Sequence, residues 1–254
     1  MDDADLLRHS GHIFLPEMGI AGVERLARAR VLVVGLGGLG TVAALYLARS
    51  GVGELLLADP DTVALSNLPR QILYGDDDVG RRKTEAAGQA LAMAGSIRLT
   101  LLPERLAGAR LRDAVRACDL VCDGSDNFAT RFAVNAACIE AGRPLVSAAV
   151  IRMVGQLTVI DPGEPAAGCY RCLYPESGEE GASCSERGIL GPIAGTLGTL
   201  QAAEAIKRLA GIPSPLTQDL WVFDAKDMTS HRIHRHRDPQ CPVCRPSAVA
   251  GPSR

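Results

Sequence analysis

Aromatic side chains are scarce in this chain. Phe, Tyr and Trp make up 4% of its 254 residues, with a single Trp, whereas 47% of the residues are hydrophobic. The core must therefore be packed mainly by Leu, Val, Ile and Ala. A chain of this length can bury one substantial core or two small ones.

An excess of charge, a long apolar run and a targeting segment are also missing. The formal net charge is −2, so no basic excess indicates nucleic acid as a partner. No charge-free apolar stretch reaches the about 18 residues that a transmembrane helix needs. The acidic start MDDADLLRHS resembles neither a secretory signal nor a transit peptide. We therefore expect a cytoplasmic protein that binds neither nucleic acid nor membranes.

Cysteine, by contrast, is present and patterned. Four of the eight cysteines form two C-x-x-C pairs, Cys169 with Cys172 and Cys241 with Cys244. Two such pairs offer the four thiolates of a tetrahedral zinc site, and four protein ligands leave no open position for substrate. We predict a structural zinc site in a reducing cytosol. Redox dithiols are disfavoured, because neither pair adjoins a thioredoxin-like strand–helix step.

The stretch Arg30–Asp61, RVLVVGLGGLGTVAALYLARSGVGELLLADPD, carries the nucleotide signal. A short Val-rich run, Val31–Val34, predicts a buried strand, and an apolar helical pattern follows it. Between them stand three glycines in G-x-G-x-x-G order: Gly35, Gly37 and Gly40. A second strand, Glu54–Ala58, ends in Asp59, where a carboxylate can accept from a ribose hydroxyl. Strand, turn, helix and acid together predict a nucleotide at the helix N-terminus.

Strands and helices are predicted to alternate through the rest of the first half. The expected strands are Ile97–Leu101, Asp119–Cys122 and Pro144–Val150, and the expected helices are Gly80–Ala94, Leu111–Arg116 and Phe128–Ala141. This alternation predicts an α/β fold with a Rossmann-like, doubly wound, mostly parallel sheet. An antiparallel C-terminal part is expected to follow, built from Gly155–Asp161, a helix at Pro192–Leu209, and a hairpin of Asp219–Asp224 and Ser230–His234.

The domain organisation is expected to be simple. Residues 1–29 form a helical arm, Leu6–Leu26, interrupted at Gly11 and Pro16. Residues 30–246 form one domain, and the Pro/Ser/Ala-rich residues 247–254 form a disordered tail.

Polar side chains are predicted where the parallel strands stop, which is where open α/β sheets bind ligands. Asn67, Arg70 and Lys83 follow the strand that ends at Asp59, and Asp126 follows the fourth strand. Two cations and an acid fit a nucleoside triphosphate with Mg²⁺. A nicotinamide dinucleotide needs fewer phosphate-directed groups and a proton donor for hydride transfer, which is not evident here. An NAD-dependent dehydrogenase stays the alternative.

Several motifs together resemble the ThiF/MoeB/HesA family of ubiquitin-activating-like adenylyltransferases, from about Leu6 to Cys244. They are GLGGLG, the pair Asp59/Asp61, SNLPRQ, Lys83, GSDN, N-x-x-x-R at Asn127–Arg131, and the two C-x-x-C pairs. The sequence looks most similar to the molybdopterin-synthase and thiamine sulfur-carrier adenylyltransferases.

The resemblance implies a reaction and its partners. Mg-ATP binds, and the C-terminal Gly-Gly carboxylate of a small ubiquitin-like sulfur carrier attacks the α-phosphate. The products are an acyl-adenylate, for later thiocarboxylate formation, and pyrophosphate. The resemblance also implies a homodimer in which the arm crosses between subunits. No rhodanese-like extension follows Cys244, so the sulfur donor is expected to be a separate protein.

The resemblance also implies roles for individual residues. Arg70 contacts the phosphates, Lys83 neutralises charge on the α- and β-phosphates, and Asp126 holds Mg²⁺. The full nucleotide-binding set that it implies is Gly37, Gly38, Asp59, Asp61, Ser66, Asn67, Arg70, Lys83, Asp126 and Asn127.

Two positions leave alternatives open. Family members usually carry a second Arg in the arm that reaches the neighbouring subunit's phosphates, but Gly11 stands there in this chain. Either Arg8 or His12 compensates, or adenylation is slow, or the chain is a specialised branch or a non-catalytic carrier-binding scaffold. Cys184 matches the family cysteine that can link covalently to the carrier, and a free thiol is the other interpretation. The carrier, and hence the pathway (molybdopterin, thiamine or another thiocarboxylate), stays open.

Overall fold

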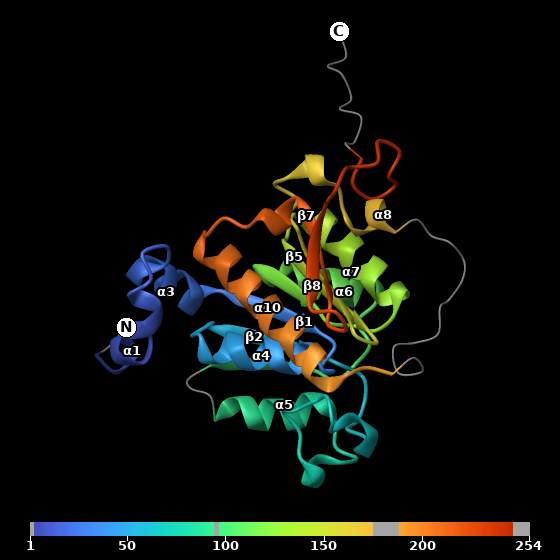
Figure 1. The fold of residues 1–254 in the computed structure, drawn as a ribbon. Coiled ribbons are helices and arrows are strands. Elements are labelled where there is room, and N and C mark those ends of the chain that lie inside the picture. Colours follow the sequence, from blue (N-terminus) through green and yellow to red (C-terminus); the bar gives the residue numbers. More distant parts are fainter. Residues whose placement is uncertain (1–2, 94–96, 175–187, 246–254) are drawn as a thin grey trace.

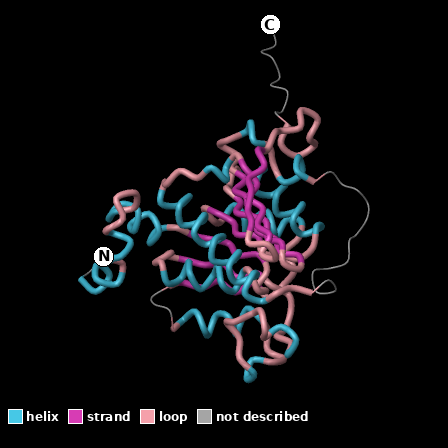
Figure 2. The backbone as a smooth tube through the Cα atoms, in the orientation of Figure 1, coloured by secondary structure: helices cyan, strands magenta, loops and turns pink. Residues whose placement is uncertain are grey.

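One eight-stranded sheet forms the centre of the computed structural model, which describes residues 3–93, 97–174 and 188–245. The strands run in the order β3-β2-β1-β4-β5-β6-β7-β8, visible as the magenta layer of Figure 2. Their bounds are β1 Arg30–Val34, β2 Glu54–Ala58, β3 Arg98–Leu102, β4 Leu120–Asp123, β5 Leu145–Ile151, β6 Val154–Ile160, β7 Asp219–Asp224 and β8 Thr229–His234. The neighbouring strands β3, β2, β1, β4 and β5 pair in parallel. The neighbouring strands β5, β6, β7 and β8 pair antiparallel. The predicted fold class is confirmed.

Helices cover both faces of the sheet (Figure 1). One face packs against α3 (Gly19–Arg28), α4 (Gly40–Arg49), α5 (Lys83–Ala92) and α10 (Gly191–Ala210). The other packs against α6 (Gly108–Arg116), α7 (Phe128–Ala141) and the short α8 (Tyr170–Leu173). The two short helices α1 (Asp3–Arg8) and α2 (Ser10–Ile13) precede α3 in the N-terminal arm. The buried residues on both faces are almost all aliphatic, as the composition requires.

Two expectations about helix limits were wrong. The helix expected from Gly80 begins only at Lys83, because the backbone of Arg82 is extended and forms a bridge with Thr62. Arg81 and Arg82 therefore lie before α5 and not in its first turn. Gly11 does not interrupt the arm either, because α2 runs through it. No helix among the described residues has the length and apolarity to cross a bilayer.

The turn between β1 and α4 needs glycine for two different reasons. Gly35 has φ +85°, a left-handed conformation that side chains rarely allow. At Gly40, a Cβ would lie 1.8 Å from the carbonyl oxygen of Gly35. The G-x-G-x-x-G spacing therefore lets the chain turn sharply at the end of β1. The backbone of this turn stays uncovered at the carboxyl edge of the sheet.

The parallel register brings three strand ends to the same edge of the sheet. Val34 at the end of β1 pairs with Ala58 of β2 on one side and with Asp123 of β4 on the other. The loops that follow these strands start side by side. The polar residues that the sequence predicts at the strand ends come from widely separated stretches, and they therefore meet above this edge.

We expect Gly40→Ala to lower the free energy of unfolding by more than about 2 kcal/mol, because the added methyl group overlaps backbone that cannot retreat. Gly195 in α10 has no atom within 4 Å of its virtual Cβ, so Gly195→Ala is the matched control. The control should raise stability by up to about 1 kcal/mol through helix propensity. Urea denaturation measures both, and a Gly40→Ala variant as stable as the parent would contradict the argument.

Candidate functional site

A cavity of about 690 Å³ lies above the carboxyl ends of β1, β2 and β4. Its lining includes nine residues singled out from the sequence: Gly37, Gly38, Asp59, Asp61, Asn67, Arg70, Lys83, Asp126 and Asn127. Ser66, the tenth, does not line the cavity; its backbone carbonyl accepts a hydrogen bond from Arg70 Nη1 at 2.9 Å. The volume is large enough for a nucleotide.

Gly38 forms part of the cavity wall with its backbone alone. A Cβ at this position would lie 2.8 Å from the Arg70 carbonyl oxygen and 3.0 Å from the Ala194 Cβ. A side chain does not fit, so a ligand in the cavity can approach the main chain here.

A buried lysine stands between two carboxylates at one side of the cavity. Lys83 is only 6% exposed, and its Nζ lies 3.0 Å from Asp61 Oδ2 and 3.9 Å from Asp59 Oδ2. The Asp59 carboxylate accepts hydrogen bonds from the backbone N–H groups of Leu36 (2.7 Å) and Asp61 (2.8 Å). Burial raises the pKa of Asp59, while Lys83 acts in the opposite direction. The lysine is thus held in place and facing the cavity before any ligand arrives.

Two arginines and a lysine line the cavity from the segments after β2. Arg82 donates from Nη1 to the Pro60 carbonyl at 2.8 Å and faces the cavity. Arg82 is exposed to solvent and also borders the cavity, next to the backbone bridge between it and Thr62. Arg81 lies outside the lining, bonded to Asp78 and Gln89.

The loop after β4 supplies the acids on the opposite side. Asn127 caps α7 by accepting from the Thr130 N–H at 2.9 Å, and Asp126 beside it is exposed to the cavity. Asp123 is fully buried beneath them: its Oδ1 accepts from the Ser125 N–H, and its Oδ2 has no partner among the described residues. The side-chain amide of Gln201 on α10 donates to the Asp123 carbonyl at 2.9 Å. The loop is therefore anchored from below while Asp126 stays free to contact a ligand.

Sequence reasoning did not assign a role to several residues that the structure places at the cavity. Glu104 and Arg105 follow β3 and line the cavity mouth, although nothing in their local pattern signals this. Arg131 also lines the cavity and is 6% exposed. The N-x-x-x-R motif at Asn127–Arg131 includes it without giving it a role, and it lies one helical turn after Asn127 on the same face of α7.

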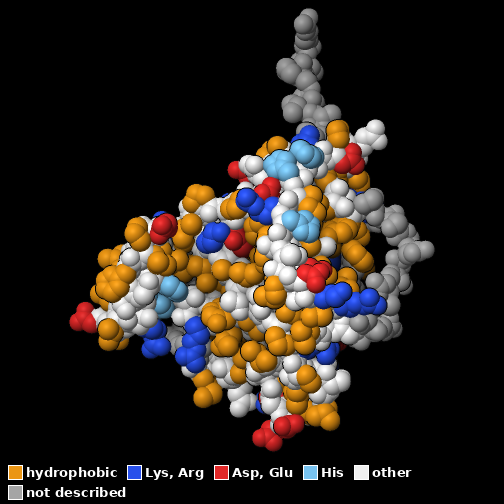
Figure 3. Space-filling view, in the orientation of Figure 1, with side chains coloured by type: hydrophobic (Ala, Val, Ile, Leu, Met, Phe, Trp, Pro, Cys, Tyr) orange, Lys and Arg blue, Asp and Glu red, His pale blue; other side chains and the backbone are white. Residues whose placement is uncertain are grey.

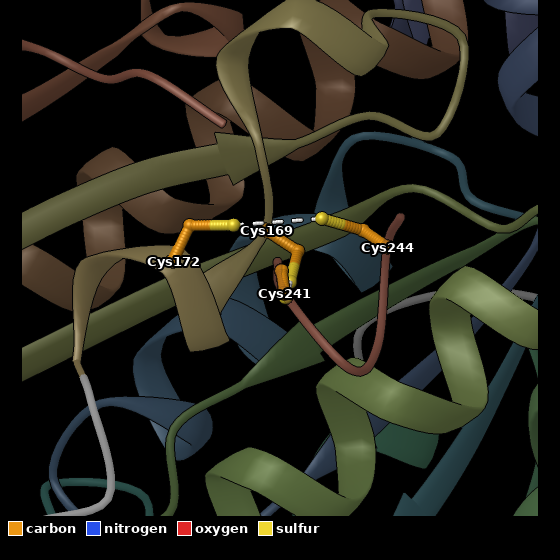
Figure 4. A group of neighbouring side chains, drawn as sticks. All are labelled: Cys169, Cys172, Cys241 and Cys244. Atoms are coloured by element: carbon orange, nitrogen blue, oxygen red, sulfur yellow. Dashed lines mark hydrogen bonds between the residues drawn. The ribbon is translucent and has the colours of Figure 1, made fainter. Parts of the chain in front are cut away.

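The four cysteines of the two C-x-x-C pairs converge, as Figure 4 shows. Their sulfur atoms lie within 4.8 Å of one another, with 3.8 Å between Cys169 and Cys241 and 3.5 Å between Cys172 and Cys244. Sulfur atoms about 2.3 Å from a tetrahedral zinc ion would be about 3.8 Å apart, so the cluster has the size that such a site needs. Cys184 lies outside the described residues, and its role stays a prediction.

Donor groups around the cluster suit charged sulfur. Asn135 Nδ2 donates to Cys169 Sγ at 3.5 Å, and the Asp238 backbone N–H donates to Cys172 Sγ at 3.4 Å. Hydrogen-bond donors around the ligands are typical of metal-thiolate sites. The residues present therefore fit a metal ion.

The N-terminal arm does not reach the cavity of its own chain. Among the residues that the structure describes, the lining includes none from the arm, and this holds for Arg8 and His12. Gly11 has no atom within 4 Å of its virtual Cβ. Whether Arg8 or His12 takes the place of the arginine expected at Gly11 concerns the neighbouring subunit, and it stays a prediction.

Comparisons with known proteins agree with this geometry. The family model described as "ThiF family" matches residues 9–243. The chain is 46% identical to the sulfur carrier protein ThiS adenylyltransferase of Escherichia coli K12, covering 96% of this chain and 97% of that protein. It is 44% identical to the molybdopterin-synthase adenylyltransferase of the same organism, covering 96% and 98%. A crystal structure of E. coli MccB with ATP superposes with a TM-score of 0.76 at 26% identity, covering 89% of this chain and 69% of MccB.

The family model matches nearly the whole length of the sequence. The structure combines three features: a glycine turn with exposed backbone, charged side chains at the ends of neighbouring strands, and a cluster of four cysteines. The chain belongs to the ThiF family.

Proposed function

We propose that this protein is an ATP-dependent adenylyltransferase that activates the C-terminal Gly-Gly carboxylate of a small ubiquitin-like sulfur-carrier protein. The observation that carries the proposal is the cavity in which Lys83 is held between two carboxylates, near Arg70 and opposite Asp126. The names of two relatives support it: one is a sulfur carrier protein ThiS adenylyltransferase, and the other is a molybdopterin-synthase adenylyltransferase. We do not favour the alternative of an NAD-dependent dehydrogenase.

In this proposal the nucleotide lies over the glycine turn. The bare backbone at Gly37 and Gly38 admits the phosphates, and Asp59 with Asp61 faces the ribose. Asn67, Arg70 and Lys83 would contact the phosphates from one side, and Asp126 with Asn127 borders the cavity on the other, where Asp126 would hold Mg²⁺. Ser66 acts through its carbonyl, which orients the Arg70 guanidinium.

Magnesium would be held by Asp126 together with the phosphate oxygens. The Asp126 carboxylate is exposed and accepts a hydrogen bond from the Asn127 side-chain amide at 3.4 Å, so it has room for a cation. When bound, Mg²⁺ supplies neutralisation of the triphosphate's charge.

The chemistry is an attack of one anion on another. A carboxylate oxygen of the carrier tail bonds to the α-phosphorus, and the bond from that phosphorus to pyrophosphate breaks. The protein's part is to orient the two anions and to offset their repulsion with fixed cations. Because Lys83 is already positioned by Asp59 and Asp61, little rearrangement is needed when charge builds up on the phosphates.

The later steps follow from the same family membership. We propose that a separate protein donates the sulfur and that Cys184 is the residue to test for a covalent link to the carrier. One relative is named for the thiamine-type carrier ThiS and another for molybdopterin synthase, so both pathways stay candidates for this chain.

The cysteine cluster is proposed to hold one structural Zn²⁺. It would join the segment after β6 to the segment after β8, since Cys169 and Cys172 lie on the first and Cys241 and Cys244 on the second. All four positions are protein ligands, so the ion would stabilise the fold and take no part in the reaction.

A homodimer is also proposed, with the arm at the interface. Large apolar side chains are exposed on the arm, including Leu7 at 77%, Phe14 at 81% and Ile20 at 52%. Figure 3 shows such side chains gathered over the arm. Apolar surface concentrated on a protruding segment is typical of a contact with another chain.

Replacing Arg70 or Lys83 with Ala should reduce carrier-dependent ATP–pyrophosphate exchange by at least about 100-fold, since each removes a fixed cation from the phosphates. Arg81→Ala is the matched control, because Arg81 is a neighbouring cation outside the cavity. Near-normal exchange in either test variant would contradict the assigned roles. Wild-type protein that binds ATP and carrier without exchange would point to the non-catalytic scaffold.

Cys172→Ser and Cys244→Ser should each lose the bound metal, and both should unfold at a lower urea concentration, because metal binding contributes to folding. Cys118→Ala changes a buried thiol outside the cluster and should keep the wild-type metal content. Metal analysis of the purified proteins and urea denaturation measure the two effects. A protein purified without metal from zinc-supplied cells would argue against the site.

Phe14→Glu should convert the protein from dimer to monomer, because it places a charge within the proposed apolar interface. Met93, at the end of α5, is equally exposed at 81% but lies outside the arm, so Met93→Glu should remain dimeric. Sedimentation velocity separates the two. A wild-type protein that is monomeric at micromolar concentration would refute the proposed dimer.

A further inference from the structure

One face of α7 connects the cavity with the cysteine cluster. Asn127, Arg131 and Asn135 are spaced four residues apart, so their side chains follow one another along this face. Asn127 and Arg131 line the cavity, and Asn135 contacts the cluster. The helix is the shared wall of two sites that the proposed function treats as independent.

Asn135 is the contact at the cluster end. Its side chain is fully buried, and it makes two hydrogen bonds to the same segment. Nδ2 donates to Cys169 Sγ at 3.5 Å, and Oδ1 accepts from the Tyr170 backbone N–H at 3.0 Å. One amide thus attaches α7 both to a metal-binding sulfur and to the first residue of α8. Because it is buried, losing either partner leaves a polar group unsatisfied.

Arg131 is the contact at the cavity end. It is 6% exposed, and its Nη2 donates to the carbonyls of Ser125 and, at 2.9 Å, Ala148. Nη1 donates to Ser147 Oγ at 3.4 Å. Arg131 therefore ties the loop after β4, which carries Asp126, to strand β5. A displacement of α7 would move this loop.

The scarce aromatic residues strengthen the attachment between α7 and α8. Phe132 of α7 packs edge-on against Tyr170 at 5.6 Å, and Phe128 packs against Tyr174 at 5.9 Å between ring centroids. Tyr170 and Tyr174 also contact each other at 4.8 Å. Four of the chain's nine aromatic residues, counted as four Phe, four Tyr and one Trp, gather at this one contact. The two helices are therefore packed closely against each other through aromatic rings.

We infer that Asn135 is a positioning residue through which a metal ion in the cysteine cluster raises the affinity of the cavity for ATP. A metal-bound Cys169 is a charged, immobile acceptor for the Asn135 amide, whereas a metal-free thiol is a weak and mobile one. The metal-bound state therefore favours one position of α7, and Arg131 transmits that position to the Asp126 loop. The inference rests on the proposed function, because it needs ATP as the ligand of the cavity.

The test uses the metal-loaded protein and two Asn135 variants. Asn135→Asp keeps the acceptor for Tyr170 but removes the N–H donor to Cys169, and Asn135→Leu removes both. Metal affinity, measured by competition with a chromophoric chelator, should fall by about 10- to 100-fold in both variants. The dissociation constant of Mg-ATP for the metal-loaded variants, measured by calorimetry, should rise about fivefold or more. Glu140→Gln, on the exposed side of the same helix, should change neither quantity.

Cobalt substitution gives a readout that a merely structural role would not move. With Co²⁺ in the cluster, loss of the N–H donor should shift the thiolate-to-cobalt absorption band, because a hydrogen bond withdraws charge from sulfur. Coupling is reciprocal, so adding Mg-ATP to cobalt-loaded wild-type protein should shift the same band. This second measurement needs no variant, so it tests the coupling between the two sites even if the Asn135 variants fail to fold.

Three results would overturn the inference. They are unchanged metal affinity in the Asn135 variants, lowered metal affinity with an unchanged ATP dissociation constant, or a cobalt band that ignores ATP. Wild-type protein that binds no ATP would overturn the proposed function as well, whereas ATP binding that is indifferent to Asn135 would overturn this inference alone.

Discussion

The whole site depends on how closely the backbone can turn between β1 and α4. At Gly40 a single added carbon would overlap the Gly35 carbonyl, and at Gly38 it would press on Arg70 and Ala194. This turn lies where the ends of β1, β2 and β4 meet, so it brings unshielded main chain beside the loops that carry the cations and the acids. With side chains in place of these glycine hydrogens, part of the cavity between the polar residues would be filled by protein atoms.

The charged side chains of the cavity are already in place before a ligand binds. A buried cation is unfavourable unless it is paired, and Lys83 is paired with Asp61 and, at longer range, with Asp59. Two backbone N–H groups in turn hold Asp59 in place, although burial raises its pKa. The arrangement holds an ammonium group at the edge of the cavity, beside the proposed phosphate position, and desolvates the Asp59 carboxylate. Such preorganisation suits a reaction between two anions, because the stabilising charge does not have to move.

The C-terminal part does more than extend the sheet. Strands β6 to β8 carry the segments on which the two cysteine pairs lie, and α8 places the first pair against α7. Burial of the fully enclosed Arg235 nearby is balanced by three backbone carbonyls, those of Gly168, Val159 and Thr217. Aromatic side chains, few in this chain, are concentrated at the α7–α8 contact. The two halves of the fold are therefore joined at the helix that also borders the cavity.

Local patterns in the sequence determined the elements and the chemistry they offer. The limits of α7 followed from its apolar spacing and from Gly142, which ends it at φ +66°, and the spacing of the cysteine pairs identified their cluster. Only the tertiary structure decided which side chains face the cavity. Arg82 borders the cavity although it is exposed, and Ser66 contributes a carbonyl instead of its hydroxyl. Arg131 and Asn135 acquire their partners from β5 and α8, which are distant in sequence. Local spacing places residues on a face of an element, but the contacts of that face depend on how the other elements pack against it.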